Sequence, residues 1–150
     1  MAEIEAKLRE AKSALKEIGC NAESVTVKEF YEYLTGEIFS DDKTSLRDVP
    51  DNEFLMVHEF SEISELKKIG KTIDKRVIVD SPETVVYEAH FSAMELELKY
   101  AIFKRDNSRA KLRLKQDKES VLDNDPNLPE TLRPRGEEIF AGSRAILKHN

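Results

Sequence analysis

The chain has 150 residues, a formal net charge of −6, one cysteine and no tryptophan. This length matches the commonest domain size, so we expect a single domain over residues 1–150. No apolar run approaches the roughly 18 residues of a membrane span, and the N-terminal segment is charged rather than a signal peptide, which favours a cytoplasmic protein with no membrane partner. Cys20 is alone, which excludes an internal disulfide and a cysteine-based zinc site.

The N-terminal quarter predicts two helices that pack rather than carry a site. From Ala2 to about Gly19, apolar residues recur at alternating spacings of three and four, as on an amphipathic helix: Ile4, Leu8, Ala11, Leu15 and Ile18. Thr26, with Glu29 three residues later, predicts a capping box that opens a helix to about Phe39. We expect the polar residues 40–49 to form a loop.

A helix predicted over Asp51–Ile69 carries carboxylates on its apolar side. At about 100° per residue, Glu59 projects from the middle of an apolar arc and Glu62 lies at its edge. The arc consists of Leu55, Ile63 and Leu66. The same arithmetic puts His58 on the polar side, where we expect a solvated contact with Glu62 four residues later.

A second helix, predicted from Pro82 to about Arg105, shows the same anomaly. Its polar stripe consists of Glu88, Ser92, Glu95 and Lys99. His90 and Glu97 fall on the opposite, apolar arc. Asp80 or Ser81 is the expected N-cap, with Pro82 in the first turn. We expect residues 71–80, between the two helices, to form an extended connector.

The remaining sequence completes an all-α chain. Ser108 is expected to cap a basic helix to about Leu122, the proline-containing residues 123–134 to form a loop, and Gly136–Leu147 to form a closing helix. The predicted fold is therefore an irregular helical bundle of about five or six helices, with the two helices described above as a central antiparallel pair.

Four ionisable groups that face a core predict a metal site between these two helices. Glu59 and Glu62 lie one turn apart, and His90 and Glu97 approach from the antiparallel neighbour. Clustered carboxylates without cysteine favour Mg²⁺ or Mn²⁺ over Zn²⁺, whereas a second histidine, which His58 can supply, favours iron or zinc.

The alternative is a structural ion-pair network. In that interpretation Glu59 and Glu62 are paired by basic residues such as Arg47, Arg76 or Arg105, and His90 is a hydrogen-bonded core histidine. Charged residues make up 36% of the chain, which supplies many partners for such a network.

The sequence from Glu59 to Glu62, followed by acidic positions on the next helix, resembles the metal-binding carboxylates of all-α nucleoside-triphosphate pyrophosphohydrolases of the MazG and dimeric dUTPase type. The resemblance covers this hairpin and implies Mg²⁺ held on paired helices of a bundle. Where that family carries Glu-x-x-Asp on its second helix, this chain has His90, Glu95 and Glu97. The dipeptide His58-Glu59 is also similar to His-Asp phosphohydrolases but lacks their Asp and further histidines.

These observations leave two function classes open. In the first, the chain is a metal-dependent hydrolase of a small phosphorylated molecule: Glu59, Glu62 and Glu97 hold the ion, His90 is a ligand or general base, and the basic segment 104–118 receives phosphate. In the second, it is a non-catalytic helical module that docks a partner or forms a homo-oligomer through its N-terminal apolar seam. RNA binding by the basic segment is the weaker expectation, because the net charge of −6 disfavours a nucleic-acid partner.

Overall fold

The computed structural model describes residues 2–37 and 49–148, and in this part of the chain every regular element is helical. The longer helices are α1 (Ala2–Glu17), α2 (Val27–Thr35), α3 (Glu53–Lys68), α5 (Glu83–Phe103), α6 (Asn107–Asp117) and α7 (Arg133–Lys148). Short turns complete the path: α4 (Val77–Asp80), the π-helical turn η1 (Lys118–Leu122) and the 3-10 turn η2 (Glu130–Leu132). The prediction of an irregular all-α bundle is confirmed.

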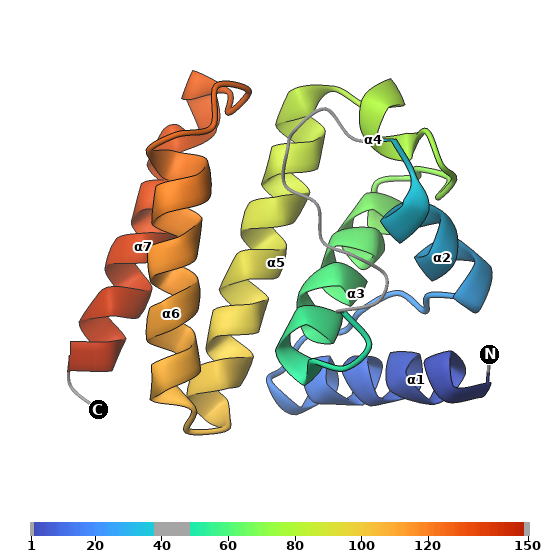
Figure 1. Cartoon of the computed structure of the whole chain (residues 1–150), viewed down its shortest axis with the longest axis horizontal. Helices are drawn as coiled ribbons and strands as arrows, with labels where there is room; N and C mark the ends of the chain where they lie inside the picture. Colours follow the sequence, from blue (N-terminus) through green and yellow to red (C-terminus); the bar gives the residue numbers. More distant parts are fainter. Residues whose placement is uncertain (1, 38–48, 149–150) are drawn as a thin grey trace.

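The expected central pair, α3 and α5, runs antiparallel through the middle of the molecule (Figure 1). Three contacts between the helices establish the antiparallel direction: Glu53 with Tyr100, His58 with Glu97, and Glu62 with His90. Residue numbers rise along α3 while those of the partners fall along α5. Helix α1 lies across α3, while α6 and α7 cover the other side of α5 (Figure 1). No helix in the described residues has the length and apolar content that crossing a membrane requires.

Most helix boundaries follow local capping chemistry. The predicted capping box of α2 is present, with Thr26 N donating to Glu29 Oε1 over 3.0 Å and Glu29 N donating to Thr26 Oγ1 over 3.1 Å. The side chain of Asn52 caps α3 through the amides of Phe54 and Leu55. Gly70, at φ +88°, follows the end of α3 in the left-handed conformation that glycine adopts without strain.

Five boundary predictions are wrong. The connector before α5 is not wholly extended, because Val77–Asp80 forms one helical turn. Pro82, rather than Asp80 or Ser81, occupies the N-cap position of α5, and the Ser81 hydroxyl donates instead to the carbonyl of Val77.

Further along the chain, Asp106 replaces Ser108 as the cap of α6, accepting from the amide of Arg109 over 3.1 Å. Helix α7 begins at Arg133, so Pro134 lies in its first turn, where a missing N–H costs nothing. Helix α2 ends at Thr35, with Gly36 as its C-cap, and so stops short of the predicted end near Phe39. The predicted loop at residues 40–49 falls almost wholly outside the described residues.

Helix α7 approaches α5 closely at Gly136. A Cβ atom added at Gly136 would lie 2.6 Å from Cδ2 of Leu122 and 2.9 Å from the ring of Phe91. Phe91 is fully buried and follows His90 directly in the sequence. The close approach at Gly136 therefore helps to hold α5, and the residues that it carries, against the C-terminal helices.

Candidate metal centre

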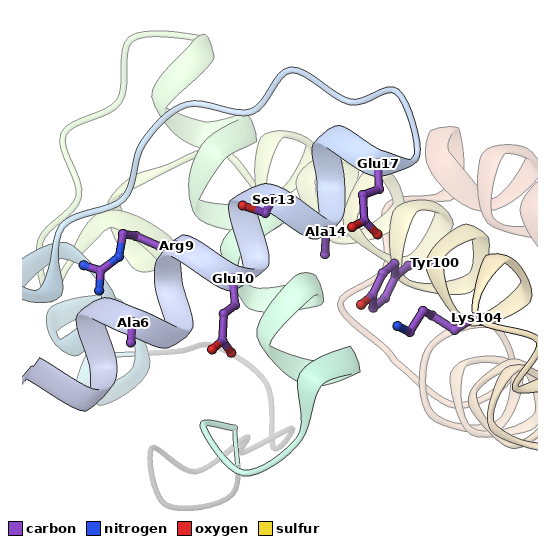
Figure 2. A pocket seen from close by; sticks show the side chains of 8 residues that line it. All are labelled: Ala6, Arg9, Glu10, Ser13, Ala14, Glu17, Tyr100 and Lys104. Atoms are coloured by element: carbon purple, nitrogen blue, oxygen red, sulfur yellow. The ribbon is translucent and has the colours of Figure 1, made fainter.

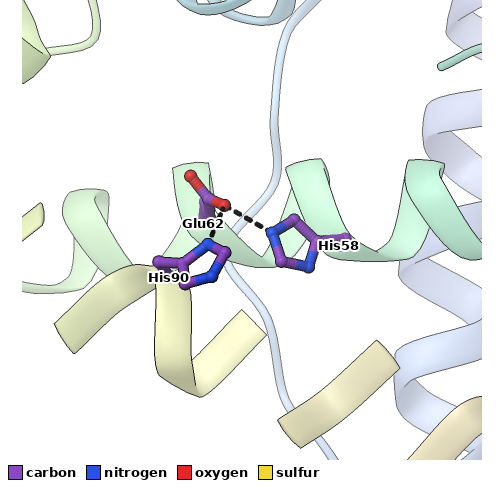
Figure 3. Close-up of side chains that lie close together, drawn as sticks. All are labelled: His58, Glu62 and His90. Carbon is purple, nitrogen blue, oxygen red and sulfur yellow. Dashed lines mark hydrogen bonds and ion pairs between the residues drawn. The ribbon is translucent and has the colours of Figure 1, made fainter. Parts of the chain in front are cut away.

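Two imidazoles of the central pair converge on one carboxylate oxygen of a third residue, Glu62 (Figure 3). His58 and Glu62 lie four residues apart on α3, hence on one face of the helix, and His58 Nε2 is 2.5 Å from Glu62 Oε2. His90 reaches the same oxygen from α5, with its Nδ1 at 3.4 Å. Ligand atoms of the three residues all lie within 4.8 Å of one another, so the His58–Glu62–His90 cluster has the size of a site that can hold a metal ion.

The placement of His58 corrects the sequence prediction. The contact with Glu62 is present, but His58 is only 3% exposed rather than solvated. The reason is that α3 packs against α1, α2 and α5, so that almost every side of it is covered. The signal that the sequence offered was Ser61 on the supposed polar side, a small residue that packs readily and is only 1% exposed.

A second group of polar side chains surrounds the cluster. Glu97 Oε1 lies 3.0 Å from His58 Nδ1, at an ion-pair distance but outside hydrogen-bond geometry. Asp117 Oδ1 lies 3.2 Å from His90 Nε2. The hydroxyl of Tyr33 donates to the other oxygen of Glu62 over 2.5 Å. Each imidazole therefore has one nitrogen facing Glu62 and the other facing a separate carboxylate.

These contacts shift the protonation equilibria in opposite directions. Burial alone lowers the pKa of His90, but its hydrogen bonds to Asp117 and Glu62 outweigh burial and raise this pKa to about 9. Burial also disfavours the charged form of His58. The nearby Glu62 and Glu97 outweigh burial, so the pKa of His58 lies well above its usual value. Burial favours neutral Glu62, yet the two imidazoles hold its pKa well below the usual range. At neutral pH these shifts favour an anionic carboxylate between two imidazolium rings.

Of the four residues predicted to form the site, Glu62 and His90 belong to the cluster. Glu97 is fully buried, as its position on the apolar arc predicted. It lies beside His58 Nδ1, the ring nitrogen that faces away from Glu62. Glu59 is also buried, at 6% exposure, and has an interaction of its own. Its charge helps to raise the pKa of Tyr33, after the larger effects of burial and of Glu62, so it lies on the Tyr33 side of the cluster.

The buried ion pair with arginine that the structure shows is at Glu97, which the ion-pair alternative did not name. Arg76 pairs on the surface with Glu37 and Asp80, Arg105 is exposed, and Arg47 lies outside the described residues. Glu97 instead receives Arg113, whose Nε lies 2.7 Å from Oε2 and whose second nitrogen reaches Oε1 at 3.2 Å.

The basic segment 104–118 therefore contains both inward-facing arginines and exposed lysines. Arg113 points inward to Glu97, and Arg109 lies 3.9 Å from the same carboxylate. Lys104, Lys111 and Lys115 are exposed. Tyr33, Arg113 and Asp117 are the members of the site that the sequence did not reveal. Tyr33 was predicted only to pack, and the other two lie within the segment predicted to bind phosphate.

A groove on another part of the surface is separate from this cluster. Figure 2 shows it between α1 and α5, with a volume of about 410 Å³. Its lining mixes acidic and basic side chains and consists of Ala6, Arg9, Glu10, Ser13, Ala14, Glu17, Tyr100 and Lys104. This mixture of charges selects no ligand class.

Comparison of the chain with protein-family models, with curated proteins and with solved structures finds no significant match. The assignment of function therefore depends on the geometry of the cluster.

Proposed function

We propose that the chain is a metal-binding protein in which His58 Nε2, Glu62 Oε2 and His90 Nδ1 hold one divalent ion. The observation that carries the proposal is the convergence of these three ligand atoms within 4.8 Å. Two imidazoles and one carboxylate form a ligand set that proteins use for zinc and for non-haem iron.

The distances within the cluster are compatible with metal entry after a small movement. Ligand atoms at roughly 2.0–2.1 Å from a tetrahedral ion lie roughly 3.3 Å from each other. His90 Nδ1 and Glu62 Oε2 already have a separation of 3.4 Å, whereas His58 Nε2 and Glu62 Oε2 are 2.5 Å apart. Opening the second pair by about 1 Å, within the range of a side-chain rotation, gives it the same spacing, and the third pair, His58 and His90, lies within 4.8 Å.

The ligand chemistry sharpens the choice of ion. The sequence favoured Mg²⁺ or Mn²⁺ on the assumption that carboxylates dominate the site. With His58 as a ligand, two of the three donor atoms are imidazole nitrogens, which bind zinc, iron and other first-row transition metals better than they bind Mg²⁺. We therefore propose a first-row transition-metal ion. Of the two ions that the sequence favoured, Mn²⁺ belongs to this group and Mg²⁺ does not.

The reaction that we propose for the loaded site is hydrolysis of a small phosphorylated molecule. Three protein ligands leave a coordination position for water, and a bound divalent ion lowers the pKa of that water towards neutrality. In this proposal His90 is a ligand rather than the general base. The basic residues of this segment that contact the site are Arg109 and Arg113, which both face Glu97.

Metal titration of chelator-treated protein tests the proposal. We expect Zn²⁺, Mn²⁺ or Fe²⁺ to bind the wild-type chain with one-to-one stoichiometry in calorimetry and to raise its melting temperature. Glu62→Gln keeps the side-chain volume but removes the anionic ligand, so it should abolish both effects.

Glu65→Gln on the same helix is the matched control, because Glu65 contacts Lys68 near the surface and lies outside the cluster. It should bind metal as the wild type does. Equal metal binding by the two variants, or no binding by the wild type, would contradict the proposed function. Metal-dependent release of phosphate from a panel of small phosphate esters tests the hydrolytic step separately.

A further inference from the structure

We infer that Asp117 and Glu97 are positioning residues of the metal site: each carboxylate holds the far nitrogen of one imidazole and so directs the near nitrogen towards the ion. This inference rests on the proposed function. It adds α6 to a site whose ligands come from α3 and α5, and it assigns a purpose to two buried acids that would not themselves touch the metal.

The contact of Asp117 with His90 is the more informative of the two. Asp117 is the last residue of α6 and is 5% exposed, and among the described residues its hydrogen-bonding partner is His90 Nε2, at 3.2 Å. Burial of a carboxylate costs free energy unless a partner compensates for it. A buried acid whose hydrogen bond goes to an imidazole on another helix indicates a role in what it contacts.

The local backbone also changes at Asp117. The α-helical pattern stops there and gives way to the π-helical turn η1 over Lys118–Leu122. Such turns are uncommon and gather at functional sites, because the extra residue changes the direction in which nearby side chains point. Here the irregular turn begins directly after the residue that reaches His90.

Glu97 plays the corresponding part for His58, and it is itself fixed. Its Oε1 lies 3.0 Å from His58 Nδ1, and the guanidinium of Arg113 contacts both of its oxygens. The side chain of Glu97 is 1% exposed, so water does not compete for these contacts. This two-point contact with the guanidinium restricts rotation of the Glu97 carboxylate and thereby the orientation of the His58 ring.

The two carboxylates favour opposite tautomers of the two histidines, Asp117 through its hydrogen bond to His90 Nε2 and Glu97 through its charge 3.0 Å from His58 Nδ1. A proton held on His58 Nδ1 leaves Nε2 free to bind metal, and a proton held on His90 Nε2 leaves Nδ1 free. The near nitrogens are the two that face Glu62 Oε2 (Figure 3). A carboxylate on the far N–H of a metal-bound imidazole fixes the ring and increases its basicity, and losing such a partner typically lowers metal affinity by about 10–100-fold.

Asp117→Ala and Asp117→Asn, compared with Asp123→Ala, test the inference. Asp117→Ala removes the acceptor, and we expect its affinity for Zn²⁺ to be about 10–100-fold lower than that of wild type. In metal-free Asp117→Ala, ¹⁵N NMR spectra recorded at a pH above the pKa of His90, where the ring is neutral, should show a mixture of its two tautomers. Asp117→Asn retains an oxygen that can accept from Nε2–H, so it should restore the single tautomer and part of the affinity. Asp123 pairs with Lys118 on the adjacent exposed turn, and its variant should behave as wild type.

The outcomes separate this inference from the proposed function. If the wild type binds no metal, the proposed function fails and the inference fails with it. If the wild type binds metal while Asp117→Ala retains both its affinity and a single Nε2–H tautomer of His90, metal binding stands and the positioning role is overturned. A loss of melting temperature in metal-free Asp117→Ala, with unchanged affinity and tautomer, would likewise assign Asp117 a structural role only.

Discussion

Two groups of opposite charges in this molecule contain similar residues but differ in their surroundings. At the surface, Arg76 contacts Glu37 and Asp80, and the side chains of Arg76 and Asp80 are 58% and 59% exposed. In the core, Arg113, Glu97 and His58 are linked in the same manner, but the Glu97 side chain is 1% exposed. Water can replace a lost partner at the surface and cannot do so in the core, so only the buried group depends on every member.

The largest expected effect comes from removing the central acid of the buried group. Glu97→Ala leaves the guanidinium of Arg113 and the imidazole of His58 without their shared partner, and we expect a loss of about 3–5 kcal/mol in the free energy of unfolding. Urea denaturation of metal-free protein measures it. Arg76→Ala is the surface counterpart and should change stability little. Similar losses for the two variants would show that burial does not separate the two groups.

The dependence of stability on pH sharpens the same contrast, because only the buried group contains histidine. The pKa of His90 is about 9 in the folded protein and near 6.5 when unperturbed, so its contribution is fully present below about pH 6.5 and is lost as the pH rises through 9. The raised pKa of His58 acts in the same direction. The lowered pKa values of Glu62 and Glu97 add stability above about pH 4.5 that is lost on acidification.

We therefore expect metal-free protein to be most stable between about pH 5 and 6.5, and to lose on the order of 3 kcal/mol towards alkaline pH from His90 alone. Urea denaturation at pH 5.5, 7.5 and 9.5 measures this limb. His90→Asn should flatten it. A wild-type stability that stays constant from pH 6.5 to 9.5 would mean that the imidazoles are not held as cations by their carboxylates.

The smallest expected effect comes from uncharged substitutions at one buried and one exposed glycine of α7. Gly136→Ala places a Cβ 2.6 Å from Leu122 and 2.9 Å from the Phe91 ring, so it should cost about 1–3 kcal/mol through overpacking. Gly142→Ala on the same helix meets nothing within 4 Å and should be neutral or stabilising, because alanine favours helix. Thermal denaturation of the two variants compares them, and equal melting temperatures would contradict the close approach of α7.

The sequence predicted which segments are helical and which of their residues face inward, because both depend on local properties. The apolar seam of α1 is buried at Leu8, Ala11, Leu15 and Ile18, as its spacing indicated. The capping box of Thr26 and Glu29 formed because both partners lie within one turn. The inward positions of Glu59, Glu62 and Glu97 also followed from helical periodicity, since each lies among apolar residues of its own helix.

The composition of the site was decided by tertiary structure. Helical periodicity identifies one buried face, but α3 is covered on several sides by α1, α2 and α5, so His58 is buried on a face that looked polar. Asp117 lies 27 residues from His90 in a basic segment, and the contact exists only because α6 folds back along α5. The sequence thus determined which helices form and which carboxylates turn inward, whereas the packing of a third and a fourth helix determined which histidines and acids meet them.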